Sequence, residues 1–244
     1  MPAGWIIALA AAGLVASFAG AALGIGGGLV VMPLLSLWLP PQQAVAYAAP
    51  MFLAASAVNF WRYRHDVARP VLWRYIPLVG VGSVLGAHFL KIASPMLVRV
   101  LMGTIALTFA GLEGLRLVRL RPLRAGYPWL AWPLSFAGGL ASTLTNIGGT
   151  VVSAAMLGES LSQSVYVATL NAVMLAMGVF KVSLFSLEGL IHVRGLAAAL
   201  PSIPAVLVGS WMGKRLNQKL SPGAFRWILV TVIGASSVLL LVGA

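Results

Sequence analysis

The stretch LGIGGGLVVMPLL, residues 23–35, places four glycines and a proline inside an apolar run. Glycine and proline are the weakest helix formers, so a continuous helix is disfavoured here. Inside a bilayer every backbone group must be hydrogen-bonded, and a broken helix persists there only when protein or a water-filled cavity surrounds it. We therefore expect Gly24, Gly26, Gly27 and Gly28 to form a buried break, with a new helix starting directly after them.

The composition shows that this break belongs to a membrane protein. Of the 244 residues, 60% are hydrophobic and 8% are charged, whereas soluble domains carry about 25% charged residues. Several apolar runs reach the roughly 20 residues that a helix needs to cross a bilayer. The sequence therefore predicts an all-α, multi-pass membrane protein surrounded by lipid.

The glycine-rich stretch occurs twice. IGGGLVV at 25–31 is echoed by IGGTVV at 147–152, and SFAG is found at both 17–20 and 135–138. Seven further residues recur at one fixed spacing. Pro77, Gly82, Ser83, Gly86, Ser94, Pro95 and Arg99 match Pro204, Gly209, Ser210, Gly213, Ser221, Pro222 and Arg226. A match of this length in one register indicates a duplicated chain.

We infer two copies of one unit, residues 1–124 and 125–244. Each unit has a glycine-broken helical hairpin followed by three spans, which gives about eight membrane segments. The spans are expected at 41–60, 71–92 and 95–116 in the first unit and at 162–185, 194–213 and 222–243 in the second. The repeated pairs Gly82/Gly86 and Gly209/Gly213 have the small-xxx-small spacing that is typical of closely packed helices.

The basic residues indicate how the two units are oriented. The net charge of +12 raises nucleic acid as a partner, but short basic loops between apolar runs follow the positive-inside rule instead. Loops 61–74, 116–124 and 214–226 carry twelve of the sixteen Lys and Arg residues. These loops share one side only if the two units are inverted. We expect an inverted repeat in the cell inner membrane (plasma membrane), with both termini outside and no nucleic acid bound.

The glycine breaks predict an anion-binding site. A helix that begins at a break presents free N–H groups and the positive end of its dipole, and glycine lets a ligand approach the backbone closely. In the second unit Thr145, Asn146, Gly148, Gly149 and Thr150 form the matching break. With inverted units, two such helix starts converge near the middle of the membrane. For GIGGG at 24–28 the alternative is that the glycines serve helix packing alone.

A few polar side chains within the spans are further candidates. Asn59 and Asn171, on the spans after the two breaks, either contact the anion or bridge helices. Arg62 and Lys181 lie near the ends of the same spans, where they either snorkel to the interface or attract anions into a vestibule. Glu113 is the one carboxylate near a span interior. It is the candidate for binding a coupling ion, with an ion pair to an arginine one turn away as the alternative.

An enzyme is disfavoured. The chain has no cysteine, which excludes thiolate metal sites and cysteine nucleophiles. No HExxH or GxSxG arrangement is present, the three histidines are scattered, and four acidic residues are too few for a paired-carboxylate site. No pattern indicates a metal or a cofactor, and none sets an oligomeric state.

Taken together, these residues resemble the TauE/SafE family of sulfite and organosulfur anion transporters. The resemblance lies in GIGGGLVVMPLL, in the SFAG–IGGTVV echo, in WRYRHDVARPVLW at 61–73 and in GSWMGKRLNQKLSPGAFRWIL at 209–229. It implies a secondary transporter for a small sulfur-containing anion, such as sulfite or a sulfonate. We expect alternating access and export across the cytoplasmic membrane, because a negative-inside potential drives anions outward. The alternative function is an anion channel.

Overall fold

The computed structural model describes residues 28–36, 39–119, 131–191 and 202–217, with scattered positions in 7–18 and 227–242. These residues form helices, and none of them lies in a strand. The helices are α2 (Gly28–Ser36), α3 (Pro41–Tyr63), α4 (Arg69–Ile92), α5 (Pro95–Arg119), α6 (Ala131–Thr145), α7 (Gly148–Met156), α8 (Gln163–Leu187) and α10 (Ser202–Asn217), with 3-10 turns η1 (Arg64–Asp66) and η3 (Leu157–Glu159). The predicted all-α class is confirmed. Gly24, Gly26, Gly27 and the predicted unit boundary after residue 124 lie outside the described residues.

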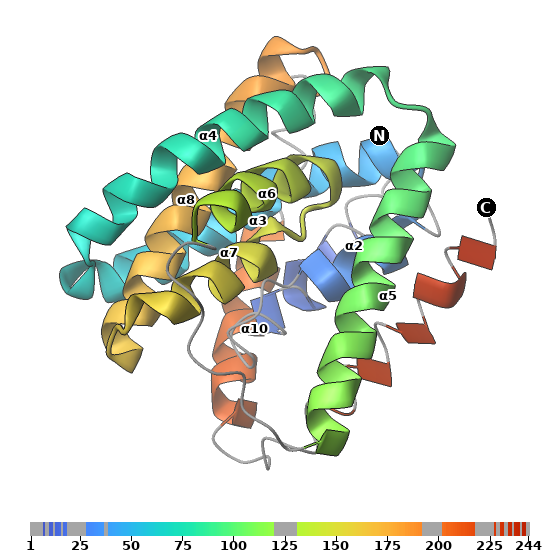
Figure 1. Ribbon diagram of the computed structural model, residues 1–244. Helices are drawn as coiled ribbons and strands as arrows, with labels where there is room; N and C mark the ends of the chain where they lie inside the picture. The colour runs from blue at the N-terminus through green and yellow to red at the C-terminus, as the bar shows by residue number, and fades with distance from the viewer. Residues whose placement is uncertain are drawn as a thin grey trace.

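Three of the described helices are long and apolar enough to cross a membrane. They are the segments Pro41–Trp61, Arg69–Ile92 and Ser164–Leu187. Figure 1 shows the short helices α2 and α7 near the middle of the molecule, with α4 crossing above them and α5 along one side. Apolar helices of this length indicate an integral membrane protein.

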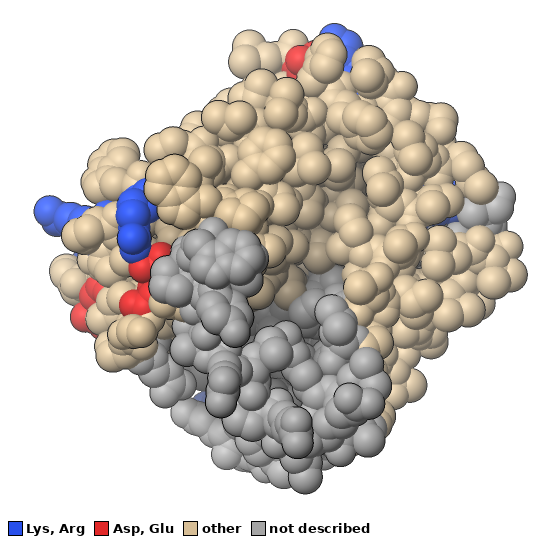
Figure 2. Space-filling view, viewed as in Figure 1, with Lys and Arg blue, Asp and Glu red and all other residues tan. Residues whose placement is uncertain are grey.

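Charged side chains gather in two separate places on the visible face, with an uncharged surface between them (Figure 2). Large apolar side chains such as Val81 and Leu85 of α4 are more than half exposed on this protein, at 56% and 51%. Trp61, Trp73 and Trp132 are also exposed, as expected of interfacial aromatic residues. Exposed apolar side chains on the described helices are as expected of a surface in contact with lipid.

Helices α4 and α6 pack in parallel through a seam of glycines. A Cβ on Gly82 would lie 2.2 Å from the carbonyl oxygen of Phe136, and one on Gly139 would lie 2.2 Å from that of Val79. A Cβ on Gly86 would meet the hydroxyl of Thr143 at 1.9 Å. No side chain fits at these distances, so the two backbones touch directly. The packing role predicted for the Gly82/Gly86 pair is confirmed.

Further contacts place α10, α3 and α8. α10 repeats the glycine contact, because a Cβ on Gly209 would lie 2.3 Å from the carbonyl oxygen of Leu14. α3 and α8 lie side by side and run antiparallel. A Cβ on Gly178 would meet the side chain of Leu53 at 3.0 Å, whereas the Ala68 amide, which follows α3, donates to Thr169 Oγ1 near the start of α8 at 2.9 Å.

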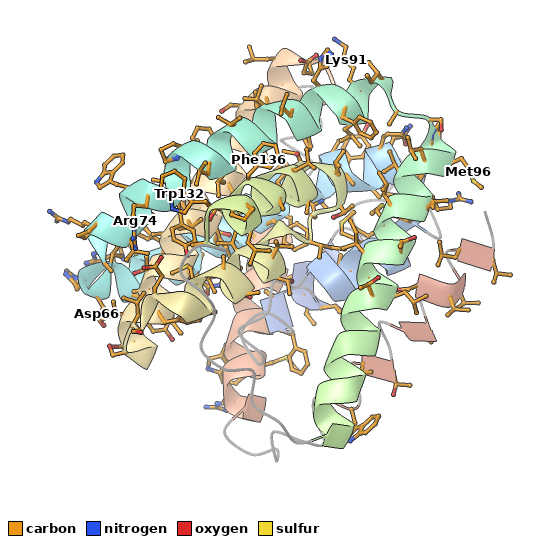
Figure 3. All side chains as sticks on the ribbon, in the orientation of Figure 1. Asp66, Arg74, Lys91, Met96, Trp132 and Phe136 are labelled. Atoms are coloured by element: carbon orange, nitrogen blue, oxygen red, sulfur yellow. The ribbon has the colours of Figure 1, made fainter. Side chains whose placement is uncertain are left out.

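Ionic contacts fasten α4 at both of its ends. At one end Arg74 pairs with the carboxylate of Glu159, and the Tyr75 hydroxyl donates to Glu159 Oε1 at 3.2 Å. At the other end Lys91 Nζ donates to Glu188 Oε2 at 2.7 Å. Figure 3 shows Arg74 and Lys91 at opposite ends of this helix. The hydrogen bond from Lys91 holds the pKa of the Glu188 carboxyl below its usual value.

Candidate functional site

The second glycine stretch is a break between two helices, as its sequence predicts. α6 ends at Thr145 and α7 begins at Gly148. Between them Asn146 has a φ of 58°, in the left-handed region that asparagine tolerates better than other side chains. The Thr145 hydroxyl donates to the Ala141 carbonyl at 2.7 Å and accepts the Ile147 amide at 3.4 Å. The TNIGG sequence thus ends one helix and starts the next.

The start of α2 meets this break. α2 begins at Gly28, and a Cβ on Gly28 would lie 2.0 Å from the carbonyl oxygen of Asn146. Only glycine allows this approach, because any side chain would overlap the backbone of the α6–α7 break. The start of α2 therefore lies directly against that break. We call Gly28, the Asn146–Ile147 break and the side chains that contact Asn146 the break junction.

The Asn146 side chain links three helices at the junction. Its Nδ2 donates to the Val45 carbonyl of α3 at 3.1 Å and lies 3.3 Å from the sulfur of Met32 in α2. Its Oδ1 accepts a hydrogen bond from Lys181 Nζ of α8. Asn146 is 7% exposed and Lys181 is 3% exposed. A lysine can only donate and a carbonyl can only accept, so the two partners fix which way the amide points.

Lys181 is the residue that the sequence interpretation misplaced. Its position near the end of a span indicated snorkelling to the interface, but the structure buries it inside the bundle and that interpretation is wrong. Its ammonium contacts Asn146 and lies 6.0 Å from the centre of the Phe52 ring. Within the described residues no carboxylate pairs with it. The sequence held one local indication of this burial. Six residues of α8 follow Lys181, so it lies about 9 Å along the axis from the end of its helix.

Gly148 and Gly149, two of the predicted site glycines, pack closely against neighbouring groups where a side chain would otherwise be. A Cβ on Gly148 would lie 2.0 Å from the carbonyl oxygen of Gly138 and 2.5 Å from the Cβ of Ser142, so α7 presses against α6. A Cβ on Gly149 would meet the terminal methyl of Met174 at 2.4 Å. Packing accounts for the lack of a side chain at these two positions. Their N–H groups belong to the first turn of α7, where the helix itself supplies no acceptors.

The side chains of the other predicted site residues differ in their hydrogen bonds and burial. Thr150 is 6% exposed, and its hydroxyl has no partner among the described residues. Asn171 donates from Nδ2 to the Val167 carbonyl of its own helix at 2.8 Å. Asn59 is half-buried on α3. Glu113 lies in α5, but its side chain falls outside the described residues.

The match to known families covers nearly the whole chain. The family model described as sulfite exporter TauE/SafE matches residues 9–240. The chain belongs to the TauE/SafE family. Comparison with curated proteins gave no match, and neither did comparison with solved structures. TauE/SafE membership implies membrane transport of sulfur-containing anions, and it places the chain among transporters rather than enzymes.

The break junction of this TauE/SafE protein and the first turn of α7 that follows it offer groups that stabilise negative charge. They are the Lys181 ammonium, the N–H groups at the start of α7 and the unpartnered Thr150 hydroxyl. In the part of the chain that the structure describes, no cluster of three or more His, Asp or Glu residues is placed to hold a metal ion. The donor set suits an oxyanion, because ammonium and amide donors form their strongest hydrogen bonds with charged oxygens.

Proposed function

We propose that this protein is a secondary transporter that exports a small sulfur-containing anion, such as sulfite or a sulfonate, across the cytoplasmic membrane. Alternating access moves the anion from one side of the break junction to the other. The observation that carries the proposal is the buried contact between Lys181 and Asn146, at the point where α2 meets the α6–α7 break. Charged groups inside membrane proteins are costly and are retained mainly for function.

The substrate site combines fixed dipoles with one cation. The N–H groups of Gly148 and Gly149 and the hydroxyl of Thr150 face the bound anion together with the Lys181 ammonium. The start of a helix carries about half a positive charge, which favours an anion without adding a second buried cation. Thr145 holds the break in shape through its two hydrogen bonds to the backbone.

The first break completes the site. Gly24, Gly26, Gly27 and Gly28 supply the equivalent amides at the start of α2. Asn59 and Asn171 are secondary contacts. The antiparallel packing of α3 on α8 brings these two asparagines to similar levels, between the contact of Leu53 with Gly178 and that of Ala68 with Thr169.

An inverted repeat of about eight segments, in units 1–124 and 125–244 with both termini outside, accounts for three packing features. α4 packs in parallel on α6, and α10 packs in the same sense on residues 13–17. The equivalent spans α3 and α8 run antiparallel, as inversion requires. The membrane potential then sets the direction, because about 2.3 kcal/mol per charge per 100 mV favours anions leaving a negative interior.

Flux measurements on the purified protein in liposomes test this function. We expect saturable efflux of sulfite or a sulfonate, with counterflow of labelled anion against an excess of unlabelled anion, and no comparable flux of chloride. Large ohmic currents without counterflow would show a channel instead. Absence of both anion binding and flux would overturn the proposal.

A pair of glycine variants tests the junction itself. Gly28→Ala pushes a methyl into the Asn146 carbonyl, whereas Gly111→Ala in α5 adds a methyl with nothing within 4 Å. We expect Gly28→Ala to lose anion binding and flux, and Gly111→Ala to keep both. Equal flux in the two variants would move the site away from the junction.

A further inference from the structure

Lys181 has a buried amino group, which is an ammonium when protonated, and its hydrogen-bond acceptor is neutral. It is 3% exposed, and its acceptor is the amide oxygen of Asn146. Asp66 is exposed on η1, and Glu159 and Glu188 pair with α4, so none of the carboxylates that the structure describes balances this charge. An ammonium held this way in an apolar interior is costly unless an opposite charge joins it. The position is therefore suited to a ligand that brings one negative charge.

Asn146 is held so that only its oxygen faces Lys181. Its Nδ2 is occupied by the Val45 carbonyl at 3.1 Å, and its left-handed backbone, with φ 58°, fixes where the side chain begins. Oδ1 thus presents a single oxygen acceptor to the ammonium from inside the break. An oxyanion bound at the start of α7 would present an oxygen in the same way.

We propose that Asn146 Oδ1 occupies the position on Lys181 that one oxygen of a singly charged anion takes on binding. This inference rests on the proposed transport function and adds the charge of the substrate to it. Exchange of the amide for the anion replaces a neutral acceptor by a charged one, which forms the stronger hydrogen bond. The occupied site is then electrically neutral.

The exchange predicts selection by charge. A monoanion neutralises Lys181, whereas a dianion of the same shape carries one uncompensated charge into the interior, where burial is strongly unfavourable. Sulfonates with one negative charge are therefore preferred over sulfate, although both present tetrahedral sulfur with oxygens on one face. Methanesulfonate and sulfate form the matched pair of probes.

The first experiment measures binding of these two probes to the purified wild-type protein by calorimetry and thermal shift at equal ionic strength. We expect methanesulfonate to bind at least about tenfold more tightly than sulfate, the change that 1.4 kcal/mol produces. Equal binding, or tighter binding of sulfate, overturns the inference.

The second experiment changes Asn146, whose Oδ1 is proposed to occupy the position of the anion oxygen. Aspartate also tolerates the left-handed conformation, so Asn146→Asp places a permanent carboxylate against Lys181. We expect Asn146→Asp to bind methanesulfonate at least about tenfold more weakly while remaining folded. Asn146→Gly removes the side chain at a backbone angle that glycine adopts freely, and we expect it to bind as tightly as wild type or more tightly. Gln43→Glu, at an exposed position on α3, makes the same amide-to-carboxylate change and should bind as wild type.

The outcomes separate the inference from the proposed function. If wild type binds and transports an anion but Asn146→Asp binds it equally well, the stand-in role is wrong and the transport function is retained. If Asn146→Gly loses binding, Asn146 is a direct ligand, and the inference fails in the same way. If wild type binds no anion, the proposed function fails first. If Asn146→Asp does not fold, the Asn146→Gly variant and the comparison of methanesulfonate with sulfate still test the inference.

Discussion

Lys91 and Lys181 both donate a hydrogen bond to a side-chain oxygen, but their surroundings are opposite. Lys91 stands at the end of α4, has a side chain that is 51% exposed and pairs with the carboxylate of Glu188. Lys181 lies inside the bundle and meets the neutral amide of Asn146. The exposed cation is paired where water already weakens the attraction, and the buried cation has no ionic partner among the described residues.

The difference distinguishes ion pairs that hold the helices together from a lysine that we propose binds the ligand. Glu159 and Glu188 belong to the second half of the chain, and each pairs with a basic residue near one end of α4. These pairs are stabilised whether or not a ligand is present. At Lys181 we propose that a bound ligand supplies the charged partner, so the same type of side chain serves a ligand in one place and the fold in the other.

The largest effect is expected when the buried cation is removed. Lys181→Met keeps the length of the side chain but loses the charge, and we expect anion binding to weaken by about 2–5 kcal/mol, the usual cost of deleting one buried charged partner. Lys91→Met should change binding little. Calorimetry with methanesulfonate and liposome flux measure both variants. Wild-type binding by Lys181→Met, in a folded protein, would remove the distinction between the two lysines.

A smaller effect is expected at the unpartnered hydroxyl. Thr150→Val deletes an oxygen that has no hydrogen bond among the described residues, so the stability of the ligand-free protein should hold or rise. Anion binding should weaken by about 0.5–1.5 kcal/mol, the net contribution of one hydrogen bond. Thr145→Val is the contrasting variant, because it loses two backbone hydrogen bonds and should lower the melting temperature. A destabilised Thr150→Val with unchanged binding would show that the hydroxyl is structural.

The ion pair between Arg74 and Glu159 is expected to affect the stability of the folded protein but not anion binding. Glu159→Gln loses the ion pair with Arg74 and weakens the hydrogen bond from Tyr75. We expect a loss of about 0.5–1 kcal/mol in the free energy of unfolding, since Arg74 is largely exposed, with unchanged affinity for the anion. Asp66→Asn, at an exposed residue of η1, is the control for removing an acid at the same end of the protein. Weaker anion binding in Glu159→Gln would tie this end of α4 to the site.

The smallest effect is a pH dependence at the other end of α4. The pKa of Glu188 is lowered in the folded protein, chiefly by the hydrogen bond from Lys91 and also by the nearby charges of Lys91 and His88. Its stabilising contribution is therefore complete above its ordinary value of 4.5 and is lost as the pH falls through the lower folded value. Thermal melts of wild type and Glu188→Gln should differ slightly at pH 6, and the difference should shrink as the pH falls below the ordinary carboxyl value near 4. A gap that widens on acidification would contradict this assignment.

The sequence predicts the helices and the break well because both depend on neighbouring residues. The TNIGG stretch ends α6 at Thr145 and starts α7 at Gly148, and the helix predicted directly after the first glycine stretch is observed as Gly28–Ser36. The span predicted at 95–116 is observed as Pro95–Arg119. Each of these features follows from composition and spacing within one or two turns of helix.

The contacts that complete the site depend on distant residues and could not be predicted in this way. Lys181 and Asn146 are 35 positions apart, and Asn146 and Val45 are 101 positions apart. Only the packing of α8 and α3 around the break brings them together. The same packing explains why Gly148 and Gly149 lack side chains, a role that their position at a helix start does not reveal.

The glycine seam between α4 and α6 has a consequence for biosynthesis. Ser83 and Gly139, which meet across the seam, are 56 positions apart. At the usual 5–20 residues per second, α4 leaves the ribosome about 3–11 seconds before the surface that it packs against exists. Its glycine face must remain unoccupied, or be held by the insertion machinery, throughout that interval. Assembly of the first half therefore waits for translation of the second.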